Sequence, residues 1–383
     1  MDTKLPQELI DYIIDYLHGE KTSLLWCSLV GKAWTASSHY HLFHTISFDY
    51  PMTNLPGQCS AFAALLVHTL DAFLTSHLTK RIRHYVRELH LKAREYTFEV
   101  GPALRALPLS VLQSVFDQLP SMHTLELDGI NPPNPSEYLG QQHTRPKLRT
   151  LRLLDQSYQP HFTSLLSFIE QIDLLKVSAA VWLMRQGPAT FENWFLGPRP
   201  HIIALRVFEV SAAFLNEDEM NAIGSFISAS RDTLEHLCIS LIAITLPDTL
   251  SDLSSMSRYN ISSCTKLIEF NVILGIAVFP AAFSASSTAW KCTTELFLKL
   301  TPHIRRITVK LSGFRHRYSY SPDPIGIMEA CDWQCWDQLF RTFEELEMIT
   351  FSDVENGHRL PDDIRHFVIA HLPVTHAAGQ LRI

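Results

Sequence analysis

The chain has 383 residues, of which 46% are hydrophobic and 19% are charged, so it can bury a large core and has room for about two or three ordinary domains. Its formal net charge of -7 at pH 7 creates a field that repels nucleic acid. We therefore predict a folded protein that does not bind nucleic acid.

The pattern of apolar and cysteine residues predicts an intracellular protein. The first residues lack the positive stretch and the continuous apolar stretch of a secretory signal. The longest apolar run, residues 273–283, is too short to span a bilayer and contains Pro280. The seven cysteines include no C-x-x-C pair, which argues against a disulfide framework and a zinc finger. We expect a cytoplasmic or nuclear protein with no membrane span, no metal and no cofactor.

Residues 1–45 predict three short amphipathic helices. Pro6 suits the first turn of a helix because its missing N–H would have no partner there, and Glu8 complements the positive end of the helix dipole. Gly19 ends this helix, and a second helix follows. The first helix carries a wide apolar stripe that consists of Leu9, Ile10, Ile13, Ile14 and Leu17. The second carries Leu24, Leu25, Cys27, Leu29 and Val30 and leads to Trp34.

This segment has more apolar surface than so few residues can bury by themselves, which implies a partner. The start Leu5-Pro6, the apolar stripe and the stretch from Cys27 to Trp34 resemble the F-box motif over residues 4–43, and the sequence is most similar to the F-box-like family of fungi. The resemblance implies that the helices bind an adaptor of the SKP family, which connects them to a cullin-RING ubiquitin ligase. The expected adaptor-binding residues are Leu5, Pro6, Leu9, Ile10, Ile13, Leu17, Leu24, Leu29, Val30 and Trp34. In the alternative interpretation, the segment is a helical cap whose Leu and Trp side chains face inward.

After residue 43 the pattern apolar-x-x-apolar-x-apolar recurs, and in a leucine-rich repeat this pattern leads into a short parallel strand. Helical patterns at residues 62–73 and 111–119 lie between instances of it, a rhythm typical of parallel α/β structure. The asparagine expected five positions after the middle residue is absent, since Ile130 and Gln156 stand there in two instances. The middle residues of the ten instances are Ile46, Leu89, Leu125, Leu151, Leu175, Leu205, Leu237, Phe270, Ile307 and Ile349.

These patterns predict the α/β fold class with two domains. An N-terminal three-helix F-box, residues 1–45, precedes an irregular leucine-rich-repeat-like solenoid, residues 46–383, with a parallel sheet on its concave face. The missing asparagine predicts uneven curvature. The alternative fold for residues 46–383 is an ordinary doubly wound α/β domain.

Alternate side chains of a strand face opposite ways, so the neighbours of the apolar residues are expected to line the concave face. Basic side chains outnumber acidic ones among them. We expect Arg152, Lys176 and Arg206 to lie side by side with Phe208 and to hold an acidic or phosphorylated segment of a target. The alternative is that these charges only keep the face solvated. The expected target-binding residues are His90, Lys92, Arg152, Lys176, Arg206, Phe208, His236, Asn271, Arg306 and Lys310.

The sequence contains none of the motifs that mark common enzymes, including G-x-G-x-x-G, G-x-S-x-G and H-E-x-x-H. The group His39, His41 and His44 has no acid or cysteine beside it at the spacing of a structural zinc site. We therefore predict a protein that is not an enzyme: the substrate-recognition subunit of a cullin-RING ubiquitin ligase, which binds an unknown target protein through its repeats. The alternative is a repeat scaffold, or protein-binding module, without a role in ubiquitin transfer.

Overall fold

The structure is a computed structural model of the chain. It describes residues 5–51, 59–94, 107–130, 146–154, 165, 169–178, 205–211, 217–241, 259–275, 283–312, 324–329, 331–354 and 359–383. The chain divides into two compact units, and each is treated by itself. Unit 1 comprises Met1–Gln156 and Phe168–Glu170, and unit 2 comprises Ser157–Ser167 and Gln171–Ile383. The boundary predicted between residues 45 and 46 falls inside unit 1.

Unit 1 begins with three helices, as the sequence predicted: α1 (Gln7–Tyr16), α2 (Lys21–Val30) and α3 (Lys32–Phe43). Pro6 is the residue before α1, and its carbonyl accepts the first hydrogen bonds of the helix from Leu9 and Ile10. Gly31 separates α2 from α3 with extended backbone. Buried residues of α1 and α2 form a small core between the helices: Ile10, Ile14 and Leu24.

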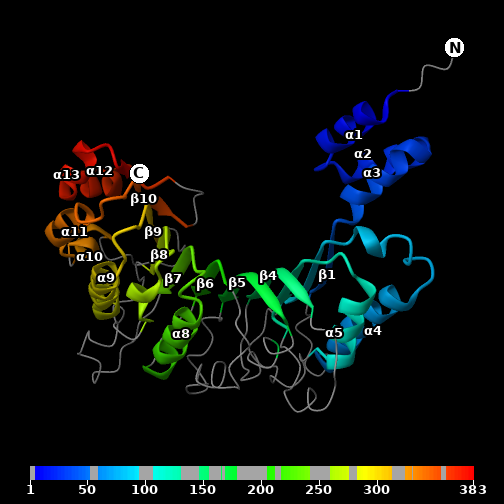
Figure 1. The fold of residues 1–383 in the computed structure, drawn as a ribbon, viewed down its shortest axis with the longest axis horizontal. Coiled ribbons are helices and arrows are strands. Elements are labelled where there is room, and N and C mark those ends of the chain that lie inside the picture. Colours follow the sequence, from blue (N-terminus) through cyan, green and yellow to red (C-terminus); the bar gives the residue numbers. More distant parts are fainter. Residues whose placement is uncertain are drawn as a thin grey trace. The chain divides into compact units, whose positions relative to one another are not determined.

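The rest of unit 1 alternates strands with helices (Figure 1). The strands are β1 (Thr45–Pro51), β2 (Glu88–Arg94), β3 (Thr124–Asp128) and β4 (Lys147–Leu154), and each pairs in parallel with the next. The helices between them are α4 (Cys59–Thr75), the short 3-10 helix η1 (Arg83–Tyr85) and α5 (Leu109–Gln118), and the helical patterns of residues 62–73 and 111–119 lie in α4 and α5.

Unit 2 continues in the same manner, and its described strands also pair in parallel and in chain order. Its strands are β5 (Gln171–Ser178), β6 (Val207–Ser211), β7 (His236–Leu241), β8 (Glu269–Gly275), β9 (Arg306–Ser312), β10 (Met348–Asp353) and β11 (Leu381–Arg382). Its helices are α8 (Glu217–Ala229), η7 (Ile261–Ser263), α9 (Phe283–Leu298), α10 (Pro324–Met328), α11 (Trp333–Phe340), α12 (Asp362–His371) and α13 (Pro373–Ala377). The predicted α/β class with parallel strands is confirmed.

The predicted middle residues of the strands mark the core side of the structure. In unit 1 they stand in one row across the strands, in the order Ile46, Leu89, Leu125 and Leu151. In unit 2 the row is Leu175, Phe208, Leu237, Phe270, Ile307 and Ile349, all fully buried. The row contains Phe208 where Leu205 was predicted, so the predicted register of β6 was wrong. None of the helices that the structure describes is long and apolar enough to cross a membrane.

Candidate partner-binding surfaces

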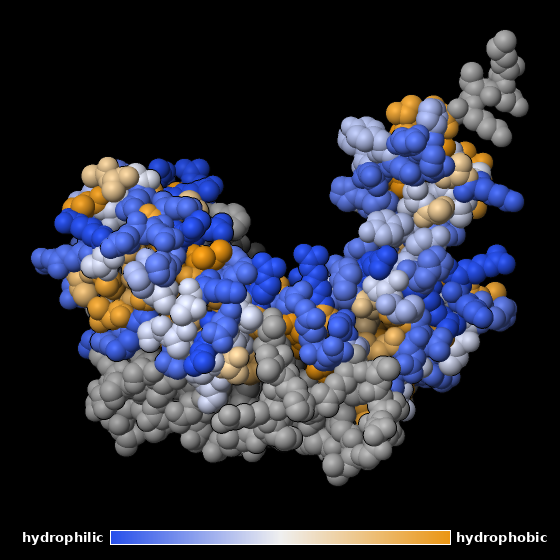
Figure 2. All heavy atoms as spheres, viewed as in Figure 1, coloured by the Kyte–Doolittle hydropathy of each residue, from blue (hydrophilic) through white to orange (hydrophobic). Residues whose placement is uncertain are grey.

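The most exposed apolar surface of unit 1 lies on α1 and α2. The side of these helices that faces away from the small core carries large apolar side chains: Leu29 is 76% exposed, Val30 68% and Trp26 66%. Figure 2 shows strongly hydrophobic residues in orange on the surface of the three-helix segment at the upper right. We call this surface the apolar face, and it consists of Leu5, Leu9, Tyr12, Ile13, Tyr16, Leu25, Trp26, Leu29 and Val30.

The structure divides the predicted adaptor-binding residues between this face and the core. Leu5, Leu9, Ile13, Leu29 and Val30 are exposed, and Pro6 is exposed beside them. Ile10 and Leu24 were predicted to contact the adaptor, but they are buried and pack on Ile14 in the core of the three helices. Leu17 and Trp34 are partly buried against the same core.

Sequence reasoning missed four residues of the apolar face: Tyr12, Tyr16, Leu25 and Trp26. The spacing of these residues along the helix could have identified two of them. Tyr12 and Tyr16 recur four residues apart, as Leu9 and Ile13 do, and residues at this spacing share one side of a helix. Tyrosine and tryptophan are enriched at protein interfaces because their rings supply contact area and a polar group together.

Polar contacts hold α1 against α3 and so fix the orientation of the apolar face. Asp15 accepts a hydrogen bond from Nε2 of His41 at 2.8 Å, and Asp11 accepts one from the hydroxyl of Ser37. The Gln7 amide donates to the Ala33 carbonyl at 3.0 Å. The hydrogen bonds of Ser37 and Gln7 lower the pKa of Asp11. The two aspartates of α1 therefore bind side chains of α3.

Both units also have a polar face, formed by the strand residues that alternate with the core residues. In unit 1 it comprises Thr45, Ser47, Asp49, Glu88, His90, Lys92, Thr124, Glu126, Asp128, Thr150 and Arg152. In unit 2 it comprises Lys176, Ser178, Glu209, Ser211, His236, Cys238, Ser240, Glu269, Asn271, Ile273, Arg306, Thr308, Lys310, Met348, Thr350 and Ser352.

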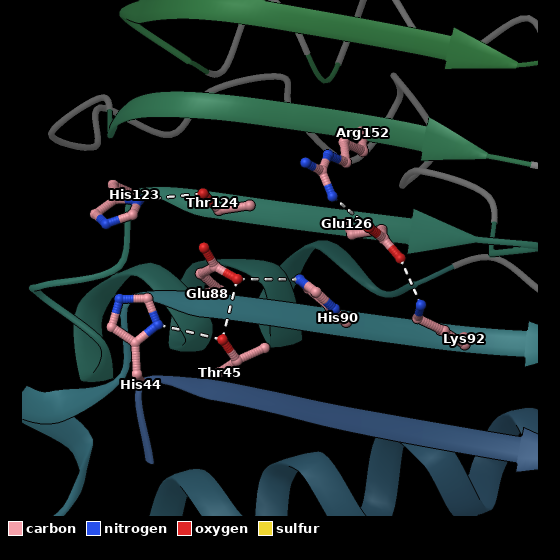
Figure 3. Close-up of polar contacts among 9 residues, drawn as sticks. All are labelled: His44, Thr45, Glu88, His90, Lys92, His123, Thr124, Glu126 and Arg152. Atoms are coloured by element: carbon pink, nitrogen blue, oxygen red, sulfur yellow. Dashed lines mark hydrogen bonds and ion pairs between the residues drawn. The ribbon is translucent and has the colours of Figure 1, made fainter. Parts of the chain in front are cut away.

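The polar face of unit 1 is organised around the carboxylate of Glu126, whose side chain is only 4% exposed. Nζ of Lys92 lies 2.7 Å from Oε1 of Glu126, and Nη1 of Arg152 lies 3.3 Å from Oε2 (Figure 3). Burial alone would raise the pKa of Glu126, but the hydrogen bond from Lys92 and the other nearby positive charges outweigh it, so the pKa is lowered. The carboxylate is therefore charged, and it holds both cations in place.

A second group on this face contains His90, Glu88 and Thr45. The Thr45 hydroxyl donates to Oε2 of Glu88 at 3.0 Å, and Nε2 of His90 lies 3.6 Å from the same oxygen (Figure 3). Burial is the main cause of a lowered pKa for His90, and the carboxylates of Glu126 and Glu88 oppose it. His90 therefore favours its neutral form, so it adds no positive charge for an acidic target.

Most of the predicted target-binding cations of unit 2 are also bound to carboxylates. Lys176 lies 2.7 Å from Glu209, its direct neighbour on β6. Glu269 lies 3.3 Å from Arg306 and 3.1 Å from His236, and its other oxygen accepts a hydrogen bond from the amide of Asn271. Lys310 is half-buried on the same face. Lys176, His236 and Arg306 are thus paired with carboxylates, and acidic residues balance the predicted excess of basic residues.

The predicted clamp of Arg152, Lys176, Arg206 and Phe208 is not present. Phe208 is fully buried and packs on Phe226, with a ring-centroid distance of 5.1 Å. Arg206 precedes β6 and binds the carboxylate of Glu235 through two nitrogens, at 3.1 and 2.7 Å. The expectation was wrong because β6 begins later than predicted, which places Glu209 instead of an arginine beside Lys176.

No group of three His, Cys, Asp or Glu side chains within the described ranges is arranged to hold a metal ion. The chain matches no protein-family model and no curated protein. Its surfaces are therefore interpreted from their own chemistry: exposed apolar side chains on two helices, and two polar faces on which most basic side chains are paired with carboxylates.

Proposed function

We propose that this chain is the substrate-recognition subunit of a cullin-RING ubiquitin ligase. In this proposal, α1 to α3 form an F-box that binds a SKP-family adaptor, and the strands that follow belong to a leucine-rich-repeat-like solenoid that binds a target protein. The chain itself performs no chemistry. It accelerates ubiquitin transfer by holding the target near the ubiquitin carrier, which is catalysis by proximity.

The observation that carries the proposal is the exposure of the apolar face. Monomeric proteins rarely expose a contiguous group of large apolar side chains unless a partner covers it. Leu9, Ile13 and Tyr16 of α1 and Trp26 and Leu29 of α2 all belong to this face. Burying such side chains contributes about 1.5 to 3 kcal/mol each, so a partner that covers them gains substantial binding free energy. Its position in residues 5–30 coincides with the stretch that resembles the F-box.

The second candidate function is a scaffold or protein-binding module that uses the same apolar face without a role in ubiquitin transfer. The two polar faces favour it, because Lys92, Lys176 and Arg306 are already bound to carboxylates of the chain and are therefore less available to a modified target. A reconstituted ligase assay separates the two functions, because only a substrate-recognition subunit delivers a bound protein for ubiquitination.

The proposal is tested by purifying the full chain together with a SKP-family adaptor and measuring whether they elute together from a sizing column. The variant carries Leu5→Ala and Pro6→Asp, which removes an exposed apolar contact and places a charge before α1. We expect the unmodified chain to elute with the adaptor and the variant to elute alone. Elution of the unmodified chain without the adaptor would refute the proposal, as would equal binding by the variant.

A further inference from the structure

A row of basic residues stands where the four strands of unit 1 begin. Backbone hydrogen bonds connect its members directly: the Arg87 N–H donates to the His44 carbonyl, His123 donates to Arg87, and Arg149 donates to His123, at 2.8 to 2.9 Å. The four residues thus share one register position across β1 to β4. We call them the basic row, and none of them belongs to the polar face.

The side chains of the row gather at one end of the strands. The rings of His44 and His123 lie with their centroids 6.3 Å apart, although they come from strands that are not adjacent. Figure 3 shows both rings at the same end of the sheet. His44 contacts the hydroxyl of Thr45 at 3.2 Å, and His123 contacts that of Thr124 at 3.1 Å, so each ring has one nitrogen engaged by a neutral group.

Among the residues that the structure describes, no carboxylate forms an ion pair with Arg87 or Arg149. A guanidinium nitrogen of Arg87 donates to the Ser121 carbonyl at 3.2 Å. This acceptor is neutral, so the hydrogen bond does not neutralise the charge of Arg87. Arg149 is exposed. Glu88 acts electrostatically on His123, but its carboxylate already accepts a hydrogen bond from Thr45.

The corresponding row of residues in unit 2 shows that the fold allows the arginines at this register position to form ion pairs. Its members are connected by the same backbone hydrogen bonds and are Asp173, Arg206, Glu235, Ile268, Arg305 and Glu347. There Arg206 binds Glu235, and Nε of Arg305 lies 3.3 Å from Glu345. In this chain of net negative charge, the row of unit 2 carries its own carboxylates, whereas the row of unit 1 does not.

The charges of the row influence one another. Burial lowers the pKa of His123, and the positive charges of His44, Arg87 and Arg149 lower it further, while Glu88 has the opposite effect. The protein therefore concentrates positive potential at this end of unit 1. An anion bound there would be stabilised by both arginines and would favour protonation of the histidine.

We propose that the basic row binds a short acidic segment of a partner polypeptide. Adjacent strands lie about 4.8 Å apart, so the row spans roughly 14 Å, and four or five residues of an extended peptide, at about 3.4 Å each, cross it. Arg87 and Arg149 are two strands apart, or about 10 Å. This spacing equals that of two carboxylates two or three residues apart in an extended peptide. Arginine suits this role because its planar group binds a carboxylate through two hydrogen bonds.

The neighbouring polar face selects a short acidic segment over nucleic acid. Glu88 directly follows Arg87, and Glu126, Asp49 and Asp128 lie three to five residues further along the same strands than the row. A long polyanion would have to extend over these carboxylates, and the net charge of -7 repels it at longer range. A segment of four or five residues places its carboxylates on the row alone. The inference holds whether or not the chain binds an adaptor, because the row and the apolar face share no residue.

The test measures binding of a fluorescein-labelled octapeptide of alternating glutamate and serine to the full chain by fluorescence anisotropy. We expect binding that Arg149→Gln weakens about tenfold, the equivalent of losing one charge-assisted hydrogen bond. Arg305→Gln is the matched control, since Arg305 holds the same register position but has its own carboxylate, and we expect less than a twofold change. Arg149 is exposed, so its substitution leaves the fold intact, which circular dichroism verifies.

Two further arms of the experiment identify the ligand. Affinity should increase as the pH falls below 6.5, the ordinary pKa of histidine, because the lowered pKa of His123 delays its protonation to that range, where it adds a positive charge to the site. A peptide with glutamine in place of glutamate should not bind. The proposal is overturned if the glutamine peptide binds equally well, if Arg149→Gln and Arg305→Gln have the same effect, or if single-stranded RNA or a phosphoserine peptide binds at Arg149 while the glutamate peptide does not.

Discussion

The carboxylate of Asp337 in α11 accepts hydrogen bonds from the backbone N–H of Thr375, at 3.0 Å, and from its hydroxyl, at 2.6 Å. It also accepts one from the backbone N–H of Val374 at 3.2 Å. Both N–H groups belong to the first turn of α13, where a helix has no partners of its own for them. A single buried side chain therefore attaches the last helix of unit 2 to α11.

Asp337→Ala should destabilise unit 2 by about 2 kcal/mol, because it removes the cap of α13 and leaves buried donors without an acceptor. The urea concentration at the midpoint of unfolding measures the effect. Glu344→Ala is the control, since Glu344 is exposed, and it should change stability by less than about 0.5 kcal/mol. Equal midpoints for the two variants would show that the contact does not stabilise the protein.

The same carboxylate predicts a dependence of stability on pH. Burial would raise the pKa of Asp337, but the hydrogen bonds from Thr375 and Val374 outweigh it and the pKa is lowered below its usual value of 3.8. The stabilisation is therefore complete above the pKa of the unfolded chain and is lost as the pH falls through the lower folded value. We expect the difference in unfolding midpoint between the natural chain and Asp337→Asn to shrink below about pH 4. A difference that stays constant down to pH 2 would contradict this.

Lys92→Met should destabilise unit 1 by about 2 kcal/mol, because the buried carboxylate of Glu126 then has only the partly exposed Arg152 as its partner. Lys147→Met is the matched control. The pair of Lys147 and Glu170 has a similar distance, 3.0 Å, but both side chains are more than half exposed, so its loss should cost less than about 1 kcal/mol. Urea unfolding of the two variants gives the comparison, and an equal loss of stability in both would show that Glu126 is not held in the way described.

Phe208→Ala should cost about 4 kcal/mol, the usual loss for a phenylalanine removed from a core. Phe208 is fully buried and contacts Phe226, whereas Arg206, two positions earlier, is exposed and bound only to Glu235. Arg206→Ala should therefore leave the unfolding midpoint nearly unchanged. A small loss of stability for Phe208→Ala would mean that the register of β6 follows Leu205, because that register places Phe208 on the solvent-facing side with Arg206.

Leu24 and Leu25 are adjacent leucines of α2 with opposite environments, and they test the division between core and apolar face. Leu24 is fully buried, and Leu25 is 53% exposed. Leu24→Ala should loosen the three helices by about 3 kcal/mol and accelerate hydrogen exchange across residues 5–43. Leu25→Ala should leave exchange in these helices unchanged. Similar exchange in both variants would refute the assignment of these two residues.

The sequence predicted the positions of nine of the ten strands β1 to β10, because a side chain that faces the core from the middle of a strand must be apolar. It misplaced β6 since Leu205 and Phe208 are both apolar and both buried, so hydrophobicity does not distinguish their registers. The same limit applies to α1, where Leu9 and Ile13 are exposed and Ile10 and Ile14 are buried. The periodicity of apolar residues identifies the apolar side of a helix. It does not show which residues on that side are buried by the rest of the chain.

The ion pairs could not be predicted from the sequence, for a different reason. Lys176 and Glu209 meet only because β5 and β6 pair in one particular register, and Glu126 meets Arg152 by a pairing of residues 26 positions apart. His41 likewise meets Asp15 from another helix. Such contacts depend on distances set by the whole fold. The prediction from sequence therefore placed Lys92, Arg152, Lys176, Arg306 and Lys310 correctly on the polar face, but it wrongly added Arg206 and missed Glu209.

The central claim is that the apolar face of α1 and α2 binds a SKP-family adaptor. The most direct measurement is the dissociation constant of the full chain and the purified adaptor for Leu29→Asp, with Leu78→Asp as the matched control. Both leucines are 76% exposed and belong to unit 1, but Leu78 lies after α4, outside the three helices. We predict that Leu29→Asp weakens binding at least a hundredfold, about 2.7 kcal/mol, whereas Leu78→Asp binds as tightly as the unmodified chain. Equal affinities for the two variants, or no binding by the unmodified chain, would contradict the claim.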